Sequence, residues 1–339
     1  MDIKINGSRL KNMFSYDWVK ILISIIAGIV VWSLLFTTLG TRITVGEEFY
    51  FTTYEKVQSV SHSNNGNLLK KLKDEGILSY DVLEWHSTTI TSAGQYSASY
   101  MLNLRTTTNE GDVIIMSDGR GEYVKEGEEN TTAKSMETAI NSRYFYNIEE
   151  FLNDAKSYCI DNGFITVNGE DYSNYTVNNA TIERYFLTER INSAGNYRKT
   201  YRTEAKKQEG VKNEIIRIEN VYKNWLSVTN AIKTAKDEGN DIIWYGEIKK
   251  YDSEGKEIEG QGEIKPFGID LYKLNKNYKD RKKIEDSWFT YTNNPEGEGE
   301  RTTAEGLVLC VFNFESAQRD MQYESLAFMN YIIKTYSGY

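Results

Sequence analysis

The stretch QYSASYMLNLRTTTNEGDVIIMSD, residues 95–118, places a helix pattern directly before a core strand. Its first part predicts a helix that runs through about Thr106. Residues 113–116 form a short apolar run that follows Glu-Gly-Asp, and such a run indicates a buried strand. The residues on either side of this helix and strand therefore decide the fold class.

Two further strands and a second helix precede this stretch. Residues 49–54 alternate within EEFYFTTYEKV and are rich in aromatic side chains, which favours a strand. NNGNLLKKLKDEGI predicts a short helix ended by Gly76, and YDVLEWHSTTI predicts the next strand. The resulting order, strand–helix–strand–helix–strand, predicts an α/β fold with a largely parallel sheet.

Later segments add to this core. YNIEEFLNDAKSYCIDNG predicts a helix ended by Gly163. Residues 242–271 predict a β-hairpin around a turn at 252–255, followed by a second turn at Pro266. GLVLCVFNF predicts a strand buried on both faces, and the last segment of the chain predicts a closing helix.

The clearest periodic signal lies between residues 211 and 232. Seven side chains recur there at spacings of four and three residues, which places them on one face of a long helix. They are Val211, Ile215, Ile218, Tyr222, Trp225, Thr229 and Ile232. We expect this face to be a packing seam rather than a ligand site. The helical stretch before it is expected to pack alongside, so that residues 181–239 form a helical hairpin.

An apolar run near the N-terminus predicts a membrane anchor. Residues 21–39 contain no charged side chain and form about 28 Å of helix, close to the roughly 30 Å hydrocarbon core of a bilayer. A secretory signal peptide has a shorter apolar region and a small-residue cleavage site, which this run lacks. A buried helix of a soluble protein is the other alternative, but apolar runs of this length are rare there.

Flanking charge predicts the orientation of this anchor. Four basic residues precede it within residues 1–20, whereas Arg42 is the only basic residue among the fifteen that follow. Basic segments stay on the cytoplasmic side of a membrane. We therefore expect residues 1–20 in the cytoplasm, residues 21–39 in the lipid bilayer of the cell membrane, and the chain after about residue 40 outside the cell.

Composition and motifs argue against nucleic-acid binding and catalysis. The chain carries a net charge of −9 and no basic patch, so we expect no nucleic-acid partner. His62 and His86 are its only histidines, neither lies beside a second ligand at metal-binding spacing, and His86 is expected to be structural. Zinc, phosphate-loop and nucleophile motifs are absent, so we expect no enzyme, no metal and no cofactor. Cys159 and Cys310 lie in apolar segments and are expected to be buried free thiols.

The anchor and its surroundings resemble a known group of proteins. FSYDWVKILISI…VVWSLLFTT…EEFYFTTY, with Tyr16, Asp17 and Trp18 as its motif, is similar to membrane-anchored extracytoplasmic proteins of Gram-positive bacteria that look like solute-binding proteins. Val19 departs from the group, which often has a second aromatic residue there. TTTNEGDVIIMSD resembles a segment of type II periplasmic-binding-protein-like lobes. FGIDLYKL and LVLCVFNFESAQRDMQYESLAFMNYIIKTY also look like this group.

This resemblance implies a two-lobed domain outside the membrane. The first α/β lobe would combine residues 40–118 and 265–339. The second lobe would comprise residues 119–264, with the helical hairpin 181–239 as an insertion.

The resemblance also implies a ligand position. Ligands of open α/β sheets bind beyond the carboxyl ends of the strands, and in two-lobed proteins they lie in the cleft. This rule places Tyr54, Ser117 and Asp118 on one wall of the ligand site. Trp244 and Tyr245 are candidates for a wall on which a ligand stacks.

The function implied by the resemblance is capture of a small molecule by a single-pass, membrane-tethered protein that catalyses no reaction and works with an ABC-type transporter. One alternative is a surface or sensory protein whose helical hairpin binds another membrane or envelope protein. A cell-envelope hydrolase is a third possibility, and it requires converging carboxylates or a nucleophile beside a base.

Overall fold

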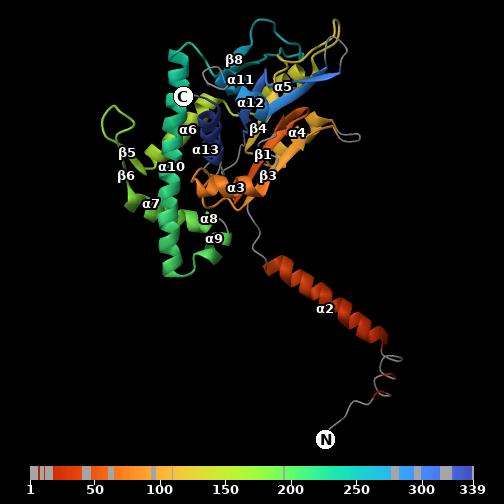
Figure 1. Cartoon of the computed structure of the whole chain (residues 1–339). Helices are drawn as coiled ribbons and strands as arrows, with labels where there is room; N and C mark the ends of the chain where they lie inside the picture. The colour runs from red at the N-terminus through yellow and green to blue at the C-terminus, as the bar shows by residue number, and fades with distance from the viewer. Residues whose placement is uncertain are drawn as a thin grey trace. The chain divides into compact units, whose positions relative to one another are not determined.

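A computed structural model of the chain describes residues 7, 11, 18–39, 47–59, 65–92, 97–108, 110–193, 195–275, 282–293, 299–313 and 323–337. The chain divides into two compact units, Met1–Arg42 and Ile43–Tyr339. The first unit contains the helix α2, and the second is a mixed α/β fold (Figure 1). The predicted α/β class is therefore confirmed.

Helix α2 (Trp18–Leu39) consists mostly of apolar side chains. Its window Trp18–Leu35 has a mean hydropathy of 2.3, and none of this window is buried inside the chain. By length and composition α2 is able to cross a membrane, although a signal sequence near an N-terminus passes the same test. The apolar helix is confirmed, whereas its insertion into a membrane and its orientation stay predictions.

Six strands form the central sheet of the second unit. Their order is β3 (Glu84–Ile90), β1 (Glu48–Tyr54), β4 (Val113–Ser117), β11 (Leu307–Val311), β8 (Glu263–Asp270) and β7 (Ile243–Ile248). β1 runs parallel to both of its neighbours, β3 and β4. The helices α3 (Asn65–Asp74) and α4 (Ala98–Thr108) lie in the crossovers that parallel neighbours require. The predicted strand–helix–strand–helix–strand order is confirmed.

The other half of the sheet is antiparallel. β11 runs antiparallel to both β4 and β8, and β7 runs antiparallel to β8. The expectation of a largely parallel sheet is therefore wrong, and the sheet is mixed. β7 and β8 are antiparallel because they are the two arms of one hairpin, and β11 inserts antiparallel between β4 and β8.

The turn expected at Pro266 is also wrong, because β8 runs through this residue. Pro266 lies opposite Tyr245 of β7, where the pairing register shifts between Trp244 and Tyr245. Proline has no N–H to donate to a ladder of hydrogen bonds, so within a sheet it is found at edges and irregularities. The register shift allows a continuous strand to contain it.

Helices cover both faces of the sheet. One face packs against α6 (Ile148–Asp161), α10 (Glu204–Asp237) and α13 (Tyr323–Tyr336). The opposite face packs against α4 and α5 (Thr131–Asn141). Figure 1 shows α6, α10 and α13 gathered on one side of β1 and β4, with α4 on the other. β4 and β11 are buried along their whole length, as two covered faces require.

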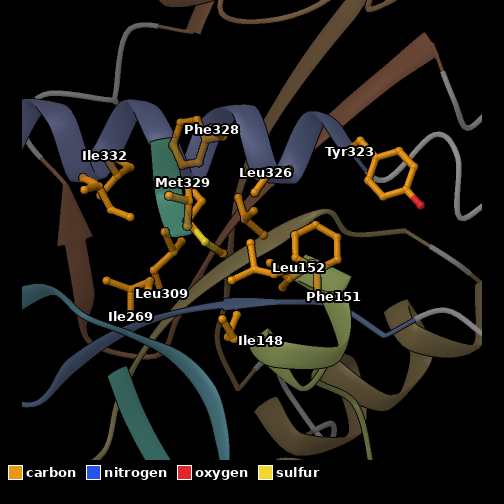
Figure 2. Packing of buried hydrophobic residues seen from close by; sticks show 14 of the residues in the cluster. Ile148, Phe151, Leu152, Ile269, Leu309, Tyr323, Leu326, Phe328, Met329 and Ile332 are labelled. Atoms are coloured by element: carbon orange, nitrogen blue, oxygen red, sulfur yellow. The ribbon is translucent and has the colours of Figure 1, made fainter. Parts of the chain in front are cut away.

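The larger core lies between α13, α6 and the sheet (Figure 2). Leu326 and Met329 of α13 point toward Leu152 of α6 and toward Ile269 and Leu309 of the sheet. Full burial of one such side chain contributes about 1.5–3 kcal/mol. The closing helix is therefore part of the main core rather than an appendage.

α10 is one continuous helix of 34 residues, about 51 Å long. Thr203 caps its N-terminus, since the threonine side chain accepts a hydrogen bond from the Lys206 N–H. The predicted apolar face does turn toward the core, where Ile218, Tyr222 and Trp225 are buried. The packing seam expected for this helix is confirmed at these residues, whereas Trp225, Thr229 and Ile232 of the same face also line a cleft that is described below.

The segment before α10 is helical but interrupted. It consists of α7 (Asn179–Tyr185), the π-helix η2 (Phe186–Arg190), α8 (Ile191–Ser193) and α9 (Gly195–Thr200). α7 and η2 pack against α10. The predicted hairpin of residues 181–239 therefore has one long continuous arm and one arm broken into short pieces.

Small elements complete the described part of this unit. One sheet contains β10 (Glu300–Thr303), β9 (Trp288–Asn293) and β2 (Val57–Ser59), and another pairs β5 (Ile165–Val167) with β6 (Tyr175–Val177). The helices α11 (Leu271–Leu274) and α12 (Lys282–Ser287) follow β8. Cys159 and Cys310 are both buried and free, as expected from their apolar segments.

Candidate ligand-binding pockets

The end of β4 places Asp118 at the centre of a hydrogen-bond network. Asp118 follows the last residue of β4, and its backbone N–H donates to the Gly306 carbonyl at 2.9 Å. Trp244 Nε1 and Arg120 Nε both donate to Asp118 Oδ2, each at 2.6 Å. Asp118 is thereby joined to β7, the strand expected to supply the facing wall of the site.

Arg120 links Asp118 to a second carboxylate. Its Nη2 donates to Asp270 Oδ2 at 2.6 Å, and Asp270 also caps α11 by accepting from the Lys273 N–H. Burial lowers the pKa of Arg120, but the hydrogen bonds and charges of Asp270 and Asp118 outweigh this effect and raise it overall. Asp118 thus has hydrogen-bond donors from both Arg120 and Trp244, which favours a structural role for this carboxylate.

A pocket of about 200 Å³ opens beside this network. Met136 and Ile140 of α5 form an apolar wall, and Asp118, Trp244 and Tyr245 line the rest together with neighbouring residues of β7. Pockets for drug-sized ligands usually measure about 300–1,000 Å³. This smaller pocket suits only a compact ligand.

Lys249 lies at the rim of the small pocket and forms ion pairs with two glutamates. Its Nζ lies 2.7 Å from Glu137 Oε1 and 2.8 Å from Glu257 Oε2. Hydrogen bonds to Glu137 and then to Glu257 raise the pKa of Lys249 above its usual value. Lys249 is therefore already paired with two carboxylates and is not a free cation for an anionic ligand.

Two of the five predicted residues do not line this pocket. Tyr54 is buried, and its hydroxyl lies 3.4 Å from Ser99 Oγ. Ser117 is also buried, and its Oγ accepts a hydrogen bond from the Gly119 N–H at 3.1 Å. Both side chains have packing or turn-forming partners. The structure thus brings Asp118, Trp244 and Tyr245 together and leaves Tyr54 and Ser117 in the core.

A larger cleft of about 450 Å³ lies on the other side of β7, between α6 and α10. Its apolar lining includes Ile148, Leu152 and Leu226, and its aromatic lining consists of Tyr172, Trp225 and Tyr245. Its polar lining includes Glu149, Lys156, Lys236 and Asp241. A mostly apolar cleft with a few polar groups, in this range of volumes, is the usual form of a small-molecule site.

An ammonium group and two aromatic rings converge in the larger cleft. Tyr172 and Trp225 pack edge to face with ring centroids 5.3 Å apart. Lys156 Nζ donates to the Tyr172 hydroxyl at 3.0 Å and lies 4.7 Å from the centroid of that ring. Tyr222 donates to the Tyr172 carbonyl at 2.8 Å, which fixes the loop that carries Tyr172. Such a group suits a ring-shaped ligand with hydrogen-bond acceptors.

Tyr245 is the one predicted residue that lines both cavities. Its hydroxyl donates to Asp241 Oδ2 at 3.1 Å, and burial together with Asp241 raises its pKa. The prediction missed Lys156 and Tyr172, because Lys156 lies in the middle of α6 and Tyr172 lies in the loop between the short strands β5 and β6, outside the central sheet. The apolar face of α10 contained Trp225, but the same spacing also fits an ordinary core residue.

Comparisons with protein-family models, with curated proteins and with solved structures find no match to this chain.

Proposed function

We propose that this chain is a membrane-tethered, extracytoplasmic protein that binds a small molecule without transforming it, in the manner of a solute-binding protein. The observation that carries the proposal is the larger cleft, where Lys156 lies against Tyr172 and Trp225. The ligand class that fits is a ring-shaped molecule with hydrogen-bond acceptors, such as a sugar or a nucleoside. Delivery to an ABC-type permease is part of the proposal.

Two features support the solute-binding-like architecture within this proposal. β4 and β8 belong to one sheet with only β11 between them, as expected if the chain leaves a first lobe after residue 118 and returns to it near residue 267. α2 supplies an apolar helix of membrane-spanning length ahead of the α/β unit.

The test is thermal unfolding of the full chain in mild detergent against sugars, nucleosides, amino acids, peptides and metal–chelate complexes. A ligand at about 100 times its Kd stabilises a fold by about 2.7 kcal/mol, which raises Tm by a few degrees. We expect one compound class to do so. Lys156→Gln and Trp225→Phe should weaken binding of that class, whereas Lys212→Gln, an exposed lysine of α10 outside the cleft, should not.

A flat response across the whole library would contradict the proposal. It would favour the alternative function, in which the helical segment 181–239 binds another envelope protein. A ligand whose affinity is unchanged in Lys156→Gln and Trp225→Phe but falls in Asp118→Asn would move the site to the smaller pocket.

A further inference from the structure

Three metal-ligating side chains meet on one face of the central sheet, at the strand ends opposite to the small pocket. Glu48 opens β1 and Glu84 opens β3, and the two are directly opposite each other in the parallel register. His86 lies two residues beyond Glu84, opposite Tyr50. Side chains two residues apart share a face of a strand, so all three ligands point to the same side.

The two distances from His86 are close to those between ligands of a single ion. His86 Nε2 lies 3.6 Å from Glu48 Oε1 and 3.5 Å from Glu84 Oε2. The potential ligand atoms of all three residues lie within 4.8 Å of one another. Two ligands about 2.0–2.1 Å from a tetrahedral zinc ion are separated by about 3.4 Å. An ion therefore fits after small side-chain adjustments.

His86 Nε2 is buried and has no hydrogen-bond partner among the described residues. Tyr50 orients the group, because its ring stacks on the His86 ring at a centroid distance of 4.6 Å and its hydroxyl donates to Glu48 Oε2 at 2.8 Å. Partners that orient a ligand in this way tune metal affinity. The Glu48 oxygen that faces His86 is the one that Tyr50 does not contact.

We propose that Glu48, Glu84 and His86 bind one divalent transition-metal ion of the Zn²⁺ type. One imidazole nitrogen with two carboxylates is a donor set for such ions, whereas Mg²⁺ and Ca²⁺ prefer oxygen ligands alone. Three protein ligands leave a fourth position for water or for a group from a partner. This inference goes beyond the proposed function, since none of the three residues lines either cleft.

The competing explanation is an ion pair without metal. Ion pairs of His86 with Glu48 and with Glu84 account for the same distances. Direct measurement of metal binding separates the two explanations.

The experiment is isothermal titration of the full chain, in mild detergent and without a histidine tag, after removal of metals by a chelator. ZnCl₂ is the titrant, with MgCl₂ and CaCl₂ in parallel. We expect one Zn²⁺ per chain and much weaker binding of the other two ions. His86→Ala and Glu84→Gln should each weaken Zn²⁺ binding about tenfold or more, and Tyr50→Phe should weaken it less.

Two matched variants control for binding elsewhere. His62→Ala removes the other histidine of the chain, and Glu75→Gln removes an exposed carboxylate that pairs with Lys71. Both should bind Zn²⁺ like the wild type. Circular dichroism reports whether each variant folds, and Glu84→Gln, at a half-exposed side chain, carries the test if His86→Ala does not fold.

The proposal is overturned if the wild type binds no Zn²⁺. It is also overturned if folded His86→Ala and Glu84→Gln bind Zn²⁺ as tightly as the wild type. Equal affinity for Zn²⁺ and Mg²⁺ would likewise contradict a site built around an imidazole nitrogen.

Discussion

Arg120 neutralises two carboxylates that the fold has largely removed from water. Asp118 and Asp270 are 7% and 1% exposed, and Arg120 donates to both at 2.6 Å. Gly306 leaves room for the Asp118 side chain, because a Cβ at this positive-φ position would overlap Asp118 Oδ1. Removing one partner of a buried ion pair usually costs about 3–5 kcal/mol, because the remaining charge stays buried.

We expect Arg120→Ala to lower the free energy of unfolding by about 2 kcal/mol. This figure is below the buried-pair range, because the Arg120 side chain is 44% exposed and solvent screens part of the interaction. Arg120→Lys should restore less than half of the loss, since a single ammonium group cannot span both carboxylates as a guanidinium does. Urea unfolding followed by circular dichroism measures both variants.

The control for this prediction is Arg202→Ala, at an exposed position outside the network, which should change stability by no more than about 0.5 kcal/mol. Equal effects of Arg120→Ala and Arg202→Ala would contradict the role assigned to Arg120.

At the scale of the element, Gly210 allows α10 to approach the helical segment that precedes it. A Cβ at this position would overlap the Phe186 ring of η2 and the Tyr201 ring. Phe186, Tyr201 and Val211 form a buried apolar cluster of their own. Helix propensity opposes this arrangement, since glycine in a helix interior costs about 1 kcal/mol relative to alanine.

Gly210→Ala should therefore destabilise the chain by about 1–3 kcal/mol, against the direction that helix propensity predicts. Thr234→Ala, at an exposed position of the same helix, should be neutral or slightly stabilising and serves as the matched control. Thermal unfolding compares the two variants. A rise in Tm for Gly210→Ala would contradict the prediction, because it would show that the Phe186 and Tyr201 rings accommodate a Cβ at this position without loss of stability.

The first turn of α13 carries a buried carboxyl group. Glu324 accepts a hydrogen bond from the Ser79 N–H at 2.9 Å. Burial raises the pKa of Glu324 to about 7, although the Ser79 N–H and the charge of Arg217 act in the opposite direction. The folded chain therefore holds this group partly protonated near neutral pH.

Because the pKa of Glu324 is raised in the folded chain, we expect the free energy of unfolding to depend on pH. Unfolded glutamate has a pKa of about 4.5, so between about pH 4.5 and about pH 7 the folded chain binds more protons than the unfolded chain, and its free energy of unfolding falls as pH rises. Glu324→Gln removes this titration and keeps an acceptor for the Ser79 N–H. At about pH 8 we expect the free energy of unfolding of the variant to exceed that of the wild type by on the order of 2 kcal/mol. At about pH 5 the two free energies should be nearly equal.

Chemical unfolding of both proteins at the two pH values measures this difference. The same difference at both values would mean that the titration of Glu324 does not contribute to stability.

At the scale of the whole molecule, local patterns predicted the elements and missed the contacts between distant ones. The apolar run of β4 and the periodic face of α10 each lie within one segment, and both predictions hold. The mixed sheet depends on where the β7–β8 hairpin and β11 insert, which no single segment encodes. The turn predicted at Pro266 was wrong because the register shift that accommodates this proline lies in a second strand, β7.

In the candidate sites, too, single residues were predictable from local patterns, whereas contacts between distant segments were not. Asp118 was predicted from a strand end and Trp244 as a residue on which a ligand stacks, and the fold brings the two side chains into direct hydrogen-bond contact. Tyr172 lies in a loop without a periodic pattern, so its place beside Lys156 was not foreseeable. His86 was expected to be structural because its sequence neighbours lack a metal-site spacing, yet Glu48 reaches it from another strand.

The proposed placement in the cell makes a prediction about the entire chain. Cys159 and Cys310 are both buried, so a membrane-impermeant maleimide should react little with the wild type. Lys212 is exposed on α10, and Lys212→Cys should be labelled in intact cells if the chain after residue 40 lies outside. Ser8→Cys, before the apolar helix, should be labelled only after lysis. Labelling of Lys212→Cys only after lysis would contradict the orientation inferred from flanking charge.

Release of a shortened chain into the medium would show that α2 is a cleaved signal sequence rather than an anchor.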